Sequence, residues 1–217
     1  MTKVSVVMSA WNAAPWIANA LNHLAAQTQP AEIIIVDSGS TDQTPDIIAL
    51  YKVSCVRTHR EALYTAWNRG LRLATGDYIF VNNCDDWAEP TAIARMAEAL
   101  DKHPEAVLAY CDMVVHHEDG HTDNIIRPEY DQYTFRQTCL VGCSPMFRKQ
   151  AVLDVGGFDE SLVVSGDQDM WCKISERGTF IHVPGLLSHY SLRTRGLEYA
   201  NRATQLKEDN VIRKRYA

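Results

Sequence analysis

The strongest constraint on the fold is the alternation, over residues 1–115, of short β-rich runs with amphipathic helical patterns. Alternation of this kind is typical of a parallel sheet whose strands are joined by helices. The run from Ile33 to Val36 is apolar throughout, which predicts a central strand buried on both faces. The expected strands are 3–9, 32–37, 55–58, 78–82 and 106–115, and the expected helices are 14–27, 41–51, 63–74 and 91–103.

The second half of the chain, residues 116–192, is less regular. Residues 116–146 are polar and rich in turn formers, with one expected strand near Ile125. The elements expected after them are a strand end and short helix over 147–153, a helix over 167–177 and a strand over 179–183. The tail, 193–217, carries 7 basic and 3 acidic residues and should contain a helix over 198–215. A length of 217 residues fits a single domain, 1–217.

The overall charge narrows the class of partner. The chain has 21 Lys and Arg residues against 27 Asp and Glu, whereas nucleic-acid binders usually have a basic surplus. We therefore expect no nucleic-acid partner. No apolar run approaches the roughly 18 residues that a membrane span needs. Because the first residues also lack the pattern of a signal peptide, we expect a cytoplasmic protein.

The six cysteines form no C-x-x-C pair, which favours reduced thiols. Cys139 and Cys143 could be combined with His116, His117 and His121 into a zinc site. Their spacing matches no standard zinc pattern, so buried or half-exposed side chains are the simpler interpretation.

Small, polar and acidic residues follow three of the expected strands, at 9–12, 37–42 and 82–87. Parallel α/β sheets bind ligands beyond the carboxyl ends of their strands, so these residues should line one cleft. The chain has no glycine before Gly39 and no G-K-[ST] sequence, which excludes a dinucleotide-binding turn and a P-loop. Phosphates bound here would need a divalent cation held by carboxylates, and Asp85 and Asp86 are the candidates. Either aspartate could instead cap the next helix.

Six segments, in order, resemble motifs of the family-2 inverting glycosyltransferases. They are 4–12, 32–44, 66–79, 83–86, 156–160 and 166–171, including Val-Asp-Ser-Gly-Ser-Thr-Asp at 36–42 and Gly-Asp-Gln-Asp at 166–169. The resemblance implies an α/β protein with a GT-A fold. A Rossmann-like nucleotide-binding half, about 1–115, would be fused to a mixed-sheet acceptor half, about 116–192, and followed by the basic C-terminal helix, 193–217.

The resemblance also implies roles for individual residues. Those expected to bind the nucleotide are Ala10, Asn12, Asp37, Ser40 and Asn68. Those expected to bind the Mn²⁺ or Mg²⁺ that bridges the donor diphosphate are Asp85, Asn83 and His189. As an alternative to His189, suggested by charge and not by the resemblance, Arg193 or Arg195 could contact the diphosphate as a fixed cation. Asp159 and Glu160 lie in a segment that resembles an acceptor-side motif. Trp87 and Trp171 are placed on the acceptor side by residue type, since a tryptophan ring can stack on a sugar, although tryptophan more often lies in the core or a pocket wall.

Asp167 is the residue that the resemblance implies as general base. Glycosyl transfer by a single displacement needs a group that takes the proton of the attacking hydroxyl, and a carboxylate within hydrogen-bond reach can do so. The charge on the leaving diphosphate must also be stabilised, which a Lewis-acid cation can supply. From residue type alone, Asp167 could instead cap the helix that follows it.

Three positions depart from the family pattern. Asn83 stands where many members have an aspartate, so it offers a neutral carbonyl oxygen in place of a charge. Ser38 replaces a frequent second aspartate but can still form hydrogen bonds to a base or ribose. His189 is matched to a histidine that follows the last strand in many members, and a loop histidine in solvent is an alternative interpretation.

The sequence therefore predicts an inverting glycosyltransferase that uses a nucleotide-sugar donor and a glycan or lipid-linked acceptor in surface polysaccharide synthesis. Two alternatives stay open. One is a non-catalytic homologue that binds a sugar nucleotide or glycan, which Asn83 suggests, and the other is a sugar nucleotidyltransferase. The basic tail suggests peripheral contact with an anionic membrane, although a solvated helix face explains it as well. The sequence does not specify the nucleotide base, the sugar, the linkage or the oligomeric state.

Overall fold

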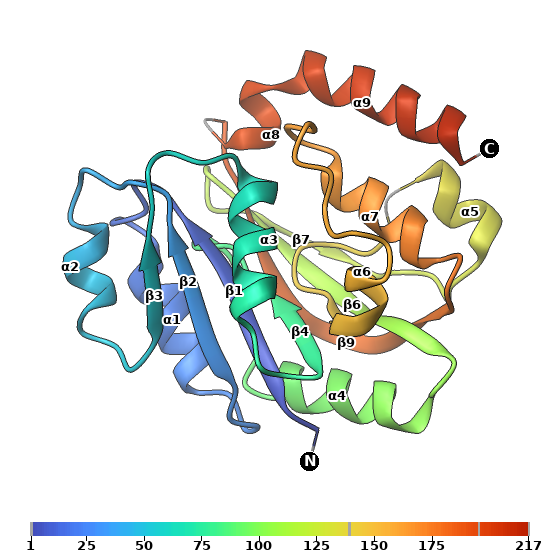
Figure 1. Cartoon of the computed structure of the whole chain (residues 1–217), viewed down its shortest axis with the longest axis horizontal. Helices are drawn as coiled ribbons and strands as arrows, with labels where there is room; N and C mark the ends of the chain where they lie inside the picture. The colour runs from blue at the N-terminus through green and yellow to red at the C-terminus, as the bar shows by residue number, and fades with distance from the viewer. Residues whose placement is uncertain (1, 139, 195, 217) are drawn as a thin grey trace.

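One mixed sheet runs through both halves of the chain (Figure 1). The computed structural model describes residues 2–138, 140–194 and 196–216. The strands in this described part are β1 (Val4–Ala10), β2 (Glu32–Asp37), β3 (Ser54–Arg57), β4 (Tyr78–Val81), β5 (Trp87–Ala88), β6 (Ala106–His117), β7 (Thr122–Ile125), β8 (Met146–Arg148) and β9 (Thr179–Leu192). Their order is β3-β2-β1-β4-β8-β6-β9-β5, with β7 paired to β6 beside this path.

Helices cover both faces of the sheet. They are α1 (Ile17–Ala25), α2 (Thr44–Ile48), α3 (Leu63–Leu73), α4 (Ala92–Lys102), α5 (Gln132–Gln137), α6 (Lys149–Leu153), α7 (Gly166–Ile174), α8 (Leu197–Ala200) and α9 (Arg202–Arg215). One apolar cluster joins α1 and α4 to the sheet, and a second joins α3, α7 and α9 to the other face. In Figure 1, α9 lies across the top of the molecule, beside α7.

The parallel half follows directly from its hydrophobic pattern. Strands β3, β2, β1 and β4 pair in parallel, and Val7 of β1 and Ile35 of β2 are fully buried. Strands that have helices on both faces need apolar side chains on both faces, so they read as continuous apolar runs. The carboxyl ends of β1, β2 and β4 consequently meet at one edge of the sheet, as the sequence analysis expected.

The second half is a mixed sheet, as the family resemblance implied, but the residue-level analysis gave no strand order for it and ended its last strand too early. Strand β8 inserts between β4 and β6 and is antiparallel to both, so β4 and β6 are not neighbours. Strand β9 continues to Leu192, whereas the predicted strand ended at residue 183 because Pro184 and Gly185 follow. A break in the β6–β9 register absorbs these two residues, and Asp112 of β6 accepts the backbone N–H of Gly185 at 2.7 Å.

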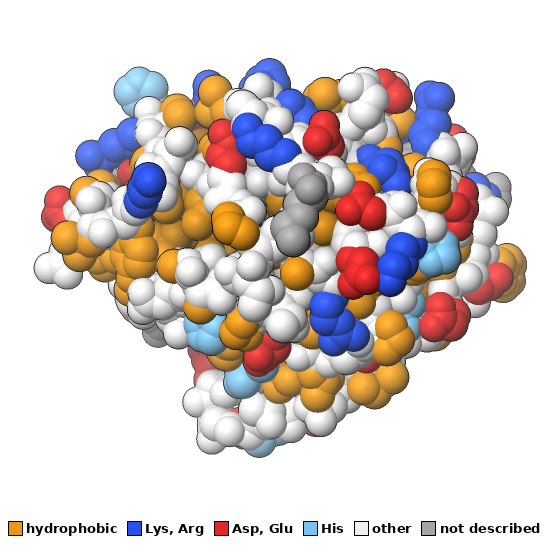
Figure 2. Space-filling view, turned by 90° about the horizontal axis from the view of Figure 1, so that it is seen from below, with side chains coloured by type: hydrophobic (Ala, Val, Ile, Leu, Met, Phe, Trp, Pro, Cys, Tyr) orange, Lys and Arg blue, Asp and Glu red, His pale blue; other side chains and the backbone are white. Residues whose placement is uncertain are grey.

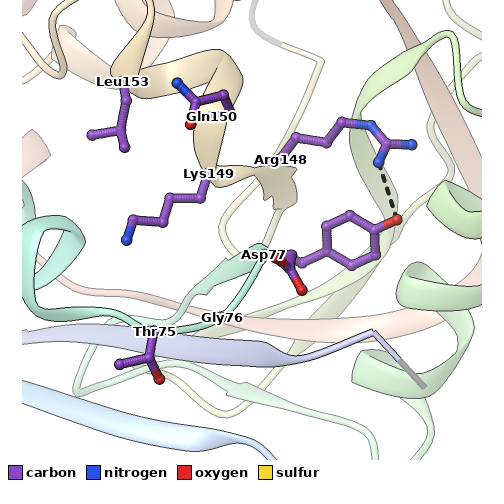
Figure 3. A pocket seen from close by; sticks show the side chains of 8 residues that line it. Thr75, Gly76, Asp77, Arg148, Lys149, Gln150 and Leu153 are labelled. Carbon is purple, nitrogen blue, oxygen red and sulfur yellow. Dashed lines mark hydrogen bonds between the residues drawn. The ribbon is translucent and has the colours of Figure 1, made fainter.

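A hollow of about 360 Å³ lies at the opposite edge of the sheet, by the amino ends of β1 and β4 (Figure 3). It is lined by the segment 75–78 and by Arg148, Lys149, Gln150 and Leu153. Arg148 donates a hydrogen bond to the Tyr78 hydroxyl at 3.1 Å, and Lys149 donates to the carbonyl of Ala74. Seen from below, where the N-terminus lies, acidic and basic side chains are interspersed over this end of the molecule (Figure 2). Of the cationic groups of this hollow, Arg148 therefore joins β8 to β4, and Lys149 joins α6 to the end of α3.

Within the described residues, no helix combines the length and apolar character that crossing a membrane requires.

Candidate functional site

The loops after β1 and β2 are joined by side-chain hydrogen bonds. The Ser40 hydroxyl accepts the N–H of Asn12 at 2.9 Å, and the Asn12 carbonyl oxygen accepts the N–H of Thr41 at 2.9 Å. Asn12 has a φ of 48°, a conformation that asparagine tolerates better than most residues. Ala10 is 1 % exposed and contributes its backbone carbonyl, which accepts the N–H of Ser38. These contacts form a fixed floor at the carboxyl edge of the sheet.

Asp37 is fully buried at the end of β2. Its Oδ1 accepts the N–H of Ser40 at 3.0 Å, and its Oδ2 lies 3.4 Å from Nε of Arg57. This Oδ2 and the buried hydroxyl of Ser38 have no hydrogen-bond partner among the described residues. Both atoms are inaccessible to solvent, and the charge of Asp37 Oδ2 is compensated by the nearby Arg57 guanidinium instead of by a hydrogen bond.

The loop after β4 concentrates carboxylates. Asp86 is 1 % exposed; its Oδ1 accepts the backbone N–H of Ser191 at 3.0 Å and its Oδ2 accepts the side-chain amide of Asn83 at 3.0 Å. The side chain of Asp85 is 30 % exposed, and its Oδ2 lies 3.4 Å from Nε of Arg193. The Ser191 hydroxyl donates to the carbonyl of Asp85 at 2.7 Å. The end of β9 therefore supports the acidic loop, which sequence analysis did not predict because residue 191 lay beyond the predicted strand.

The electrostatics of this loop fit a hard divalent cation. Burial, and then the charge of Asp85, raise the pKa of Asp86 to about 7. Burial also raises the pKa of Asp85, although the charge of Arg193 opposes it. Asn83 uses its amide nitrogen on Asp86, which leaves the side-chain carbonyl oxygen of Asn83 as an acceptor in the same loop as Asp85. Oxygen donors of this kind suit Mg²⁺ or Mn²⁺, and an added positive charge would relieve the repulsion between the two aspartates.

His189 is neither a loop histidine nor free to bind the same cation. It lies within β9, and its Nδ1 is 2.9 Å from Nε2 of His116 while its Nε2 is 2.8 Å from the carboxylate of Glu89. The ring of Trp87 stacks on it at 5.0 Å and also packs on His116. Both ring nitrogens of His189 therefore have protein partners, which does not support the predicted role as a metal ligand. Trp87 is largely occupied by these histidines.

Arg193 lies where a diphosphate contact was expected, next to Asp85. Its guanidinium also lies 4.0 Å from the centre of the Trp16 ring, just before α1. This places a fixed cation between the acidic loop and the start of α1. Arg195, the other predicted contact, lies outside the described residues.

Asp167 is in the first turn of α7, which packs against the beginning of α3. A Cβ on Gly166 would come within 2.6 Å of the Tyr64 ring, so only glycine permits this approach. The Tyr64 hydroxyl donates to the carbonyl of Val164, and burial followed by the charge of Asp167 raises the pKa of Tyr64. Because α3 begins at the carboxyl edge of the parallel strands, Asp167 is placed at that edge too. It approaches from the α3 face, whereas Arg193 and Asp85 lie towards α1 on the other face.

The segment before Asp167 is held by α9. The buried carboxylate of Glu208 accepts the backbone N–H groups of Val163, Val164 and Ser165 at 2.7, 2.9 and 2.9 Å. The adjacent Asp209 accepts the Ser165 hydroxyl at 2.6 Å. Glu208 could not be predicted from the sequence, because its partners lie 43 to 45 residues away and no motif connects them.

The other end of α9 also holds α7. Arg215 donates to the buried Asp169 at 2.5 Å, and the Tyr216 hydroxyl donates to the same Oδ1 at 3.2 Å. Lys173 lies 2.7 Å from its other oxygen. Of the basic residues in the tail, Arg193 and Arg215 are therefore paired with carboxylates of this chain. The other basic residues of α9 are also exposed; they are Arg202, Lys207, Arg213 and Lys214.

Asn68 was predicted to line the nucleotide wall, but its side-chain amide makes its hydrogen bonds to Phe158 and Glu160. Its amide nitrogen donates to the carbonyl of Phe158 and to Glu160, both at 2.9 Å, and its carbonyl oxygen accepts the N–H of Phe158 at 2.8 Å. Gly157 must lack a side chain, since a Cβ there would lie 2.7 Å from Oδ1 of Asn68. The amide thereby joins α3 to the segment that was predicted to face the acceptor.

The predicted acceptor-side residues divide into two groups. Trp171 is 1 % exposed and packs on Phe147 and Phe158, so its ring belongs to the core and is not available to stack on a sugar. Asp159 accepts the Ser161 N–H and hydroxyl, and Glu160 accepts from Asn68. These two carboxylates shape the segment that leads to α7.

Comparison with known proteins gives matches over most of the chain. The model of the family described as "Glycosyl transferase family 2" matches residues 5–154. The chain is 26% identical over 183 residues to an uncharacterized glycosyltransferase of Rickettsia typhi, which covers 78% of this chain and 58% of that protein. It spans less than two thirds of the length of this relative and of a Mycobacterium bovis relative, of which it covers 39%.

Two solved structures share the fold. The mannosyltransferase PcManGT of Pyrobaculum calidifontis, in complex with GDP-Man and Mn²⁺, aligns with a TM-score of 0.79 and 21% identity, covering 100% of this chain and 65% of that one. S. aureus TarS 1-349 in complex with UDP-GlcNAc aligns with a TM-score of 0.75 and 21% identity, covering 88% and 59%. These alignments show that the chain has the GT-A fold.

Proposed function

The chain belongs to glycosyl transferase family 2, and on this premise we propose that it transfers a glycosyl group from a nucleotide diphosphate sugar to a hydroxyl group, with inversion. The observation that carries the proposal is the position of two acidic elements, the loop of Asp85 and the first turn of α7, at one edge of the sheet. The nucleotide-sugar complexes of the two structural neighbours support a donor of this class.

The donor side of the mechanism rests on fixed polar groups. Asp37 and the loop of Asn12 and Ser40 form the floor on which the base and ribose bind. Asp85 and Asn83 would hold Mn²⁺ or Mg²⁺, which when bound supplies Lewis-acid stabilisation of the departing diphosphate. Arg193 adds a positive charge beside Asp85 that requires no reorganisation during the reaction.

Asp167 acts on the acceptor side. Its carboxylate takes the proton of the acceptor hydroxyl while the oxygen attacks the anomeric carbon from the side opposite the diphosphate. One C–O bond forms as the bond to the leaving diphosphate breaks, which inverts the anomeric centre. Glu208 is a positioning residue, since it fixes the backbone of 163–165 immediately before the base.

The acceptor that we propose is a glycan or a lipid-linked glycan of a cell-surface polymer, met on the cytoplasmic face of the membrane. The exposed side of α9 supports peripheral membrane contact, because it carries both apolar and basic side chains. These are Leu206 and Val211, each 51% exposed, and the exposed residues Lys207, Arg213 and Lys214. Co-sedimentation with vesicles containing anionic phospholipid, at low and high salt, tests this contact. Binding that persists unchanged with neutral vesicles, or no binding at all, would refute it.

The proposed reaction is tested by screening UDP-, GDP- and dTDP-sugars with Mn²⁺ for calorimetric binding and for release of the nucleoside diphosphate. We expect one donor class to bind in a Mn²⁺-dependent manner and to release nucleoside diphosphate slowly even without acceptor. Binding without any release, with or without candidate glycan acceptors, would favour the non-catalytic homologue. Formation of a sugar nucleotide and pyrophosphate from a sugar phosphate and a nucleoside triphosphate would favour the nucleotidyltransferase.

A further inference from the structure

The β6–β7 hairpin gathers histidines and carboxylates that the proposed transfer reaction does not use. Strand β7 pairs antiparallel with β6, with Val115 opposite Asp123 and His116 opposite Thr122. Side chains alternate between the faces of a sheet, so His117, His121 and Asp123 share one face while His116 points to the other. The register therefore divides the histidines into two groups, and His116 joins His189 on the opposite face.

The three side chains on the shared face converge. The rings of His117 and His121 stack with centroids 3.7 Å apart and planes 15° apart. Asp123 Oδ2 lies 2.8 Å from Nε2 of His117 and 3.8 Å from Nε2 of His121. One ligand atom from each of the three residues falls within a mutual distance of 4.8 Å. A single ion between them could contact two imidazole nitrogens and one carboxylate oxygen.

A second carboxylate orients one of the imidazoles. Asp119 Oδ1 lies 2.6 Å from Nδ1 of His121 and also accepts its backbone N–H at 3.2 Å. Metal-binding histidines commonly place their second ring nitrogen on a carboxylate, which fixes the ring and makes the other nitrogen a better ligand. Here that contact leaves Nε2 of His121 directed towards Asp123 and His117.

The hairpin is rigid enough to keep this arrangement. The backbone N–H of His117 donates to the carbonyl of His121, and the N–H of Gly120 donates to the carbonyl of His117, both at 3.0 Å. Gly120 has a φ of 91° in this turn, a conformation that suits glycine. Glu118, in the same turn, accepts the Thr194 hydroxyl at 2.8 Å, which connects the turn to the segment after β9.

We propose that His117, His121 and Asp123 form a binding site for a borderline divalent metal ion such as Zn²⁺ or Ni²⁺, separate from the acidic loop of Asp85. Two imidazoles and a carboxylate suit these ions better than Mg²⁺, which prefers oxygen ligands. The site is partly exposed, so water completes the coordination. The proposal does not depend on the transferase activity, because it uses none of the residues assigned to that reaction.

The test uses Ni²⁺ alone as the probe, with the full chain treated to remove bound metal. In a titration followed by NMR, Ni²⁺ should broaden the imidazole signals of His117 and His121 before those of the other six histidines. By calorimetry, His121→Ala should weaken Ni²⁺ binding at least tenfold, and Asp119→Asn should weaken it about 10-fold through the lost orientation of the ring.

His103→Ala is the matched control, since His103 is an exposed histidine that pairs with one carboxylate, Glu105 at 3.0 Å, and has no second histidine in that pair. Its Ni²⁺ affinity should equal that of the wild type. The proposal is overturned if Ni²⁺ first broadens His116 and His189, if His121→Ala binds as tightly as His103→Ala, or if the wild type does not bind Ni²⁺. All three variants alter exposed side chains, and an unchanged backbone amide spectrum will confirm that each remains folded.

Discussion

The two sides of the candidate site are built in different ways. On the donor side, the loops that follow β1 and β2 hold one another through Asn12 and Ser40, and parallel pairing of their strands brings them together. On the base side, the segment before Asp167 is held by Glu208, 43 to 45 residues further along the chain. A site edge made by neighbouring strands therefore depends on local contacts alone, whereas the position of Asp167, the proposed base, depends on the C-terminal helix.

The largest effect should come from substituting Asp167, the proposed base. Asp167→Asn removes the proton acceptor but keeps the size of the side chain and its place in α7. We expect kcat for transfer, or for donor hydrolysis, to fall by about 10²–10⁴-fold with donor affinity unchanged. Steady-state kinetics together with calorimetry measure both quantities. Normal turnover in this variant would remove Asp167 from the mechanism.

Substitutions on the donor side should lower the affinity for the donor and leave the rate of the chemical step largely unchanged. Asp85→Asn removes one negative charge from the acidic loop, so the Mn²⁺-dependent part of donor affinity should fall by at least about 10-fold. Calorimetric titration of the donor with and without Mn²⁺ isolates that part. Ser54→Ala, on the exposed strand β3, serves as the control. Equal affinity of Asp85→Asn and wild type would show that the cation is held elsewhere.

Substitution of Glu208 tests whether α9 positions Asp167, the proposed base. A glutamine at 208 has only one acceptor oxygen for three backbone N–H groups, so the segment 163–165 should loosen. We expect Glu208→Gln to lower kcat on the order of 10-fold at unchanged donor affinity, and to cost about 1–3 kcal/mol of unfolding free energy.

The matched control for Glu208→Gln is Lys207→Gln, an exposed position on the same helix. Assays well below both melting temperatures separate positioning from stability. If Glu208→Gln loses stability but keeps its kcat, then Glu208 is only a structural contact. Greater hydrogen exchange at 163–168 in this variant would report loosening of the segment even if Asp167 proved not to be the base.

The smallest expected effect is the loss of folding stability at low pH that comes from Glu160, in the segment that leads to α7. The hydrogen bond from the Asn68 amide lowers the pKa of Glu160 below its usual value. Partial burial raises this pKa, and the hydrogen bond from Thr65 lowers it further. A lowered carboxyl pKa stabilises the fold above the unfolded pKa of about 4.5, and this contribution is lost as the pH falls through the folded pKa. Melting temperatures from pH 6 to pH 3 should therefore fall more for wild type than for Glu160→Gln. Because the Glu160 carboxylate is exposed, we expect its contribution to the free energy of unfolding to be less than about 1 kcal/mol. If the melting temperatures of wild type and Glu160→Gln fell equally with pH, this assignment would be contradicted.

The same contrast explains what could be predicted from the sequence. The parallel strands of the first half and the family motifs could be predicted from the sequence, because each depends on a local pattern of apolar, small or acidic residues. Strand β8 between β4 and β6, and the continuation of β9 beyond Pro184, depend on contacts with distant strands, which local propensity does not encode. The GT-A fold itself was inferred from the resemblance and is confirmed by the structural neighbours.

In the candidate site, too, residues in local motifs could be predicted and residues that act through distant contacts could not. Asp85 and Asp167 stand at recognisable motif positions, so their candidacy came from the sequence, although their roles stay proposals. Trp171 was assigned to the acceptor by residue type, but its ring packs against Phe147 in the core. Ser191 and Glu208 could not be found because neither belongs to a motif and each acts through backbone groups far along the chain.

The most direct test of the central claim is a crystal structure of the protein with Mn²⁺ and the nucleotide sugar that binds best in the screen. We predict that the diphosphate and the cation lie against Asp85, and that the Asp167 carboxylate faces the anomeric carbon from the side opposite the diphosphate. A donor bound away from Asp85, or an anomeric carbon that Asp167 cannot approach from that side, would contradict the account.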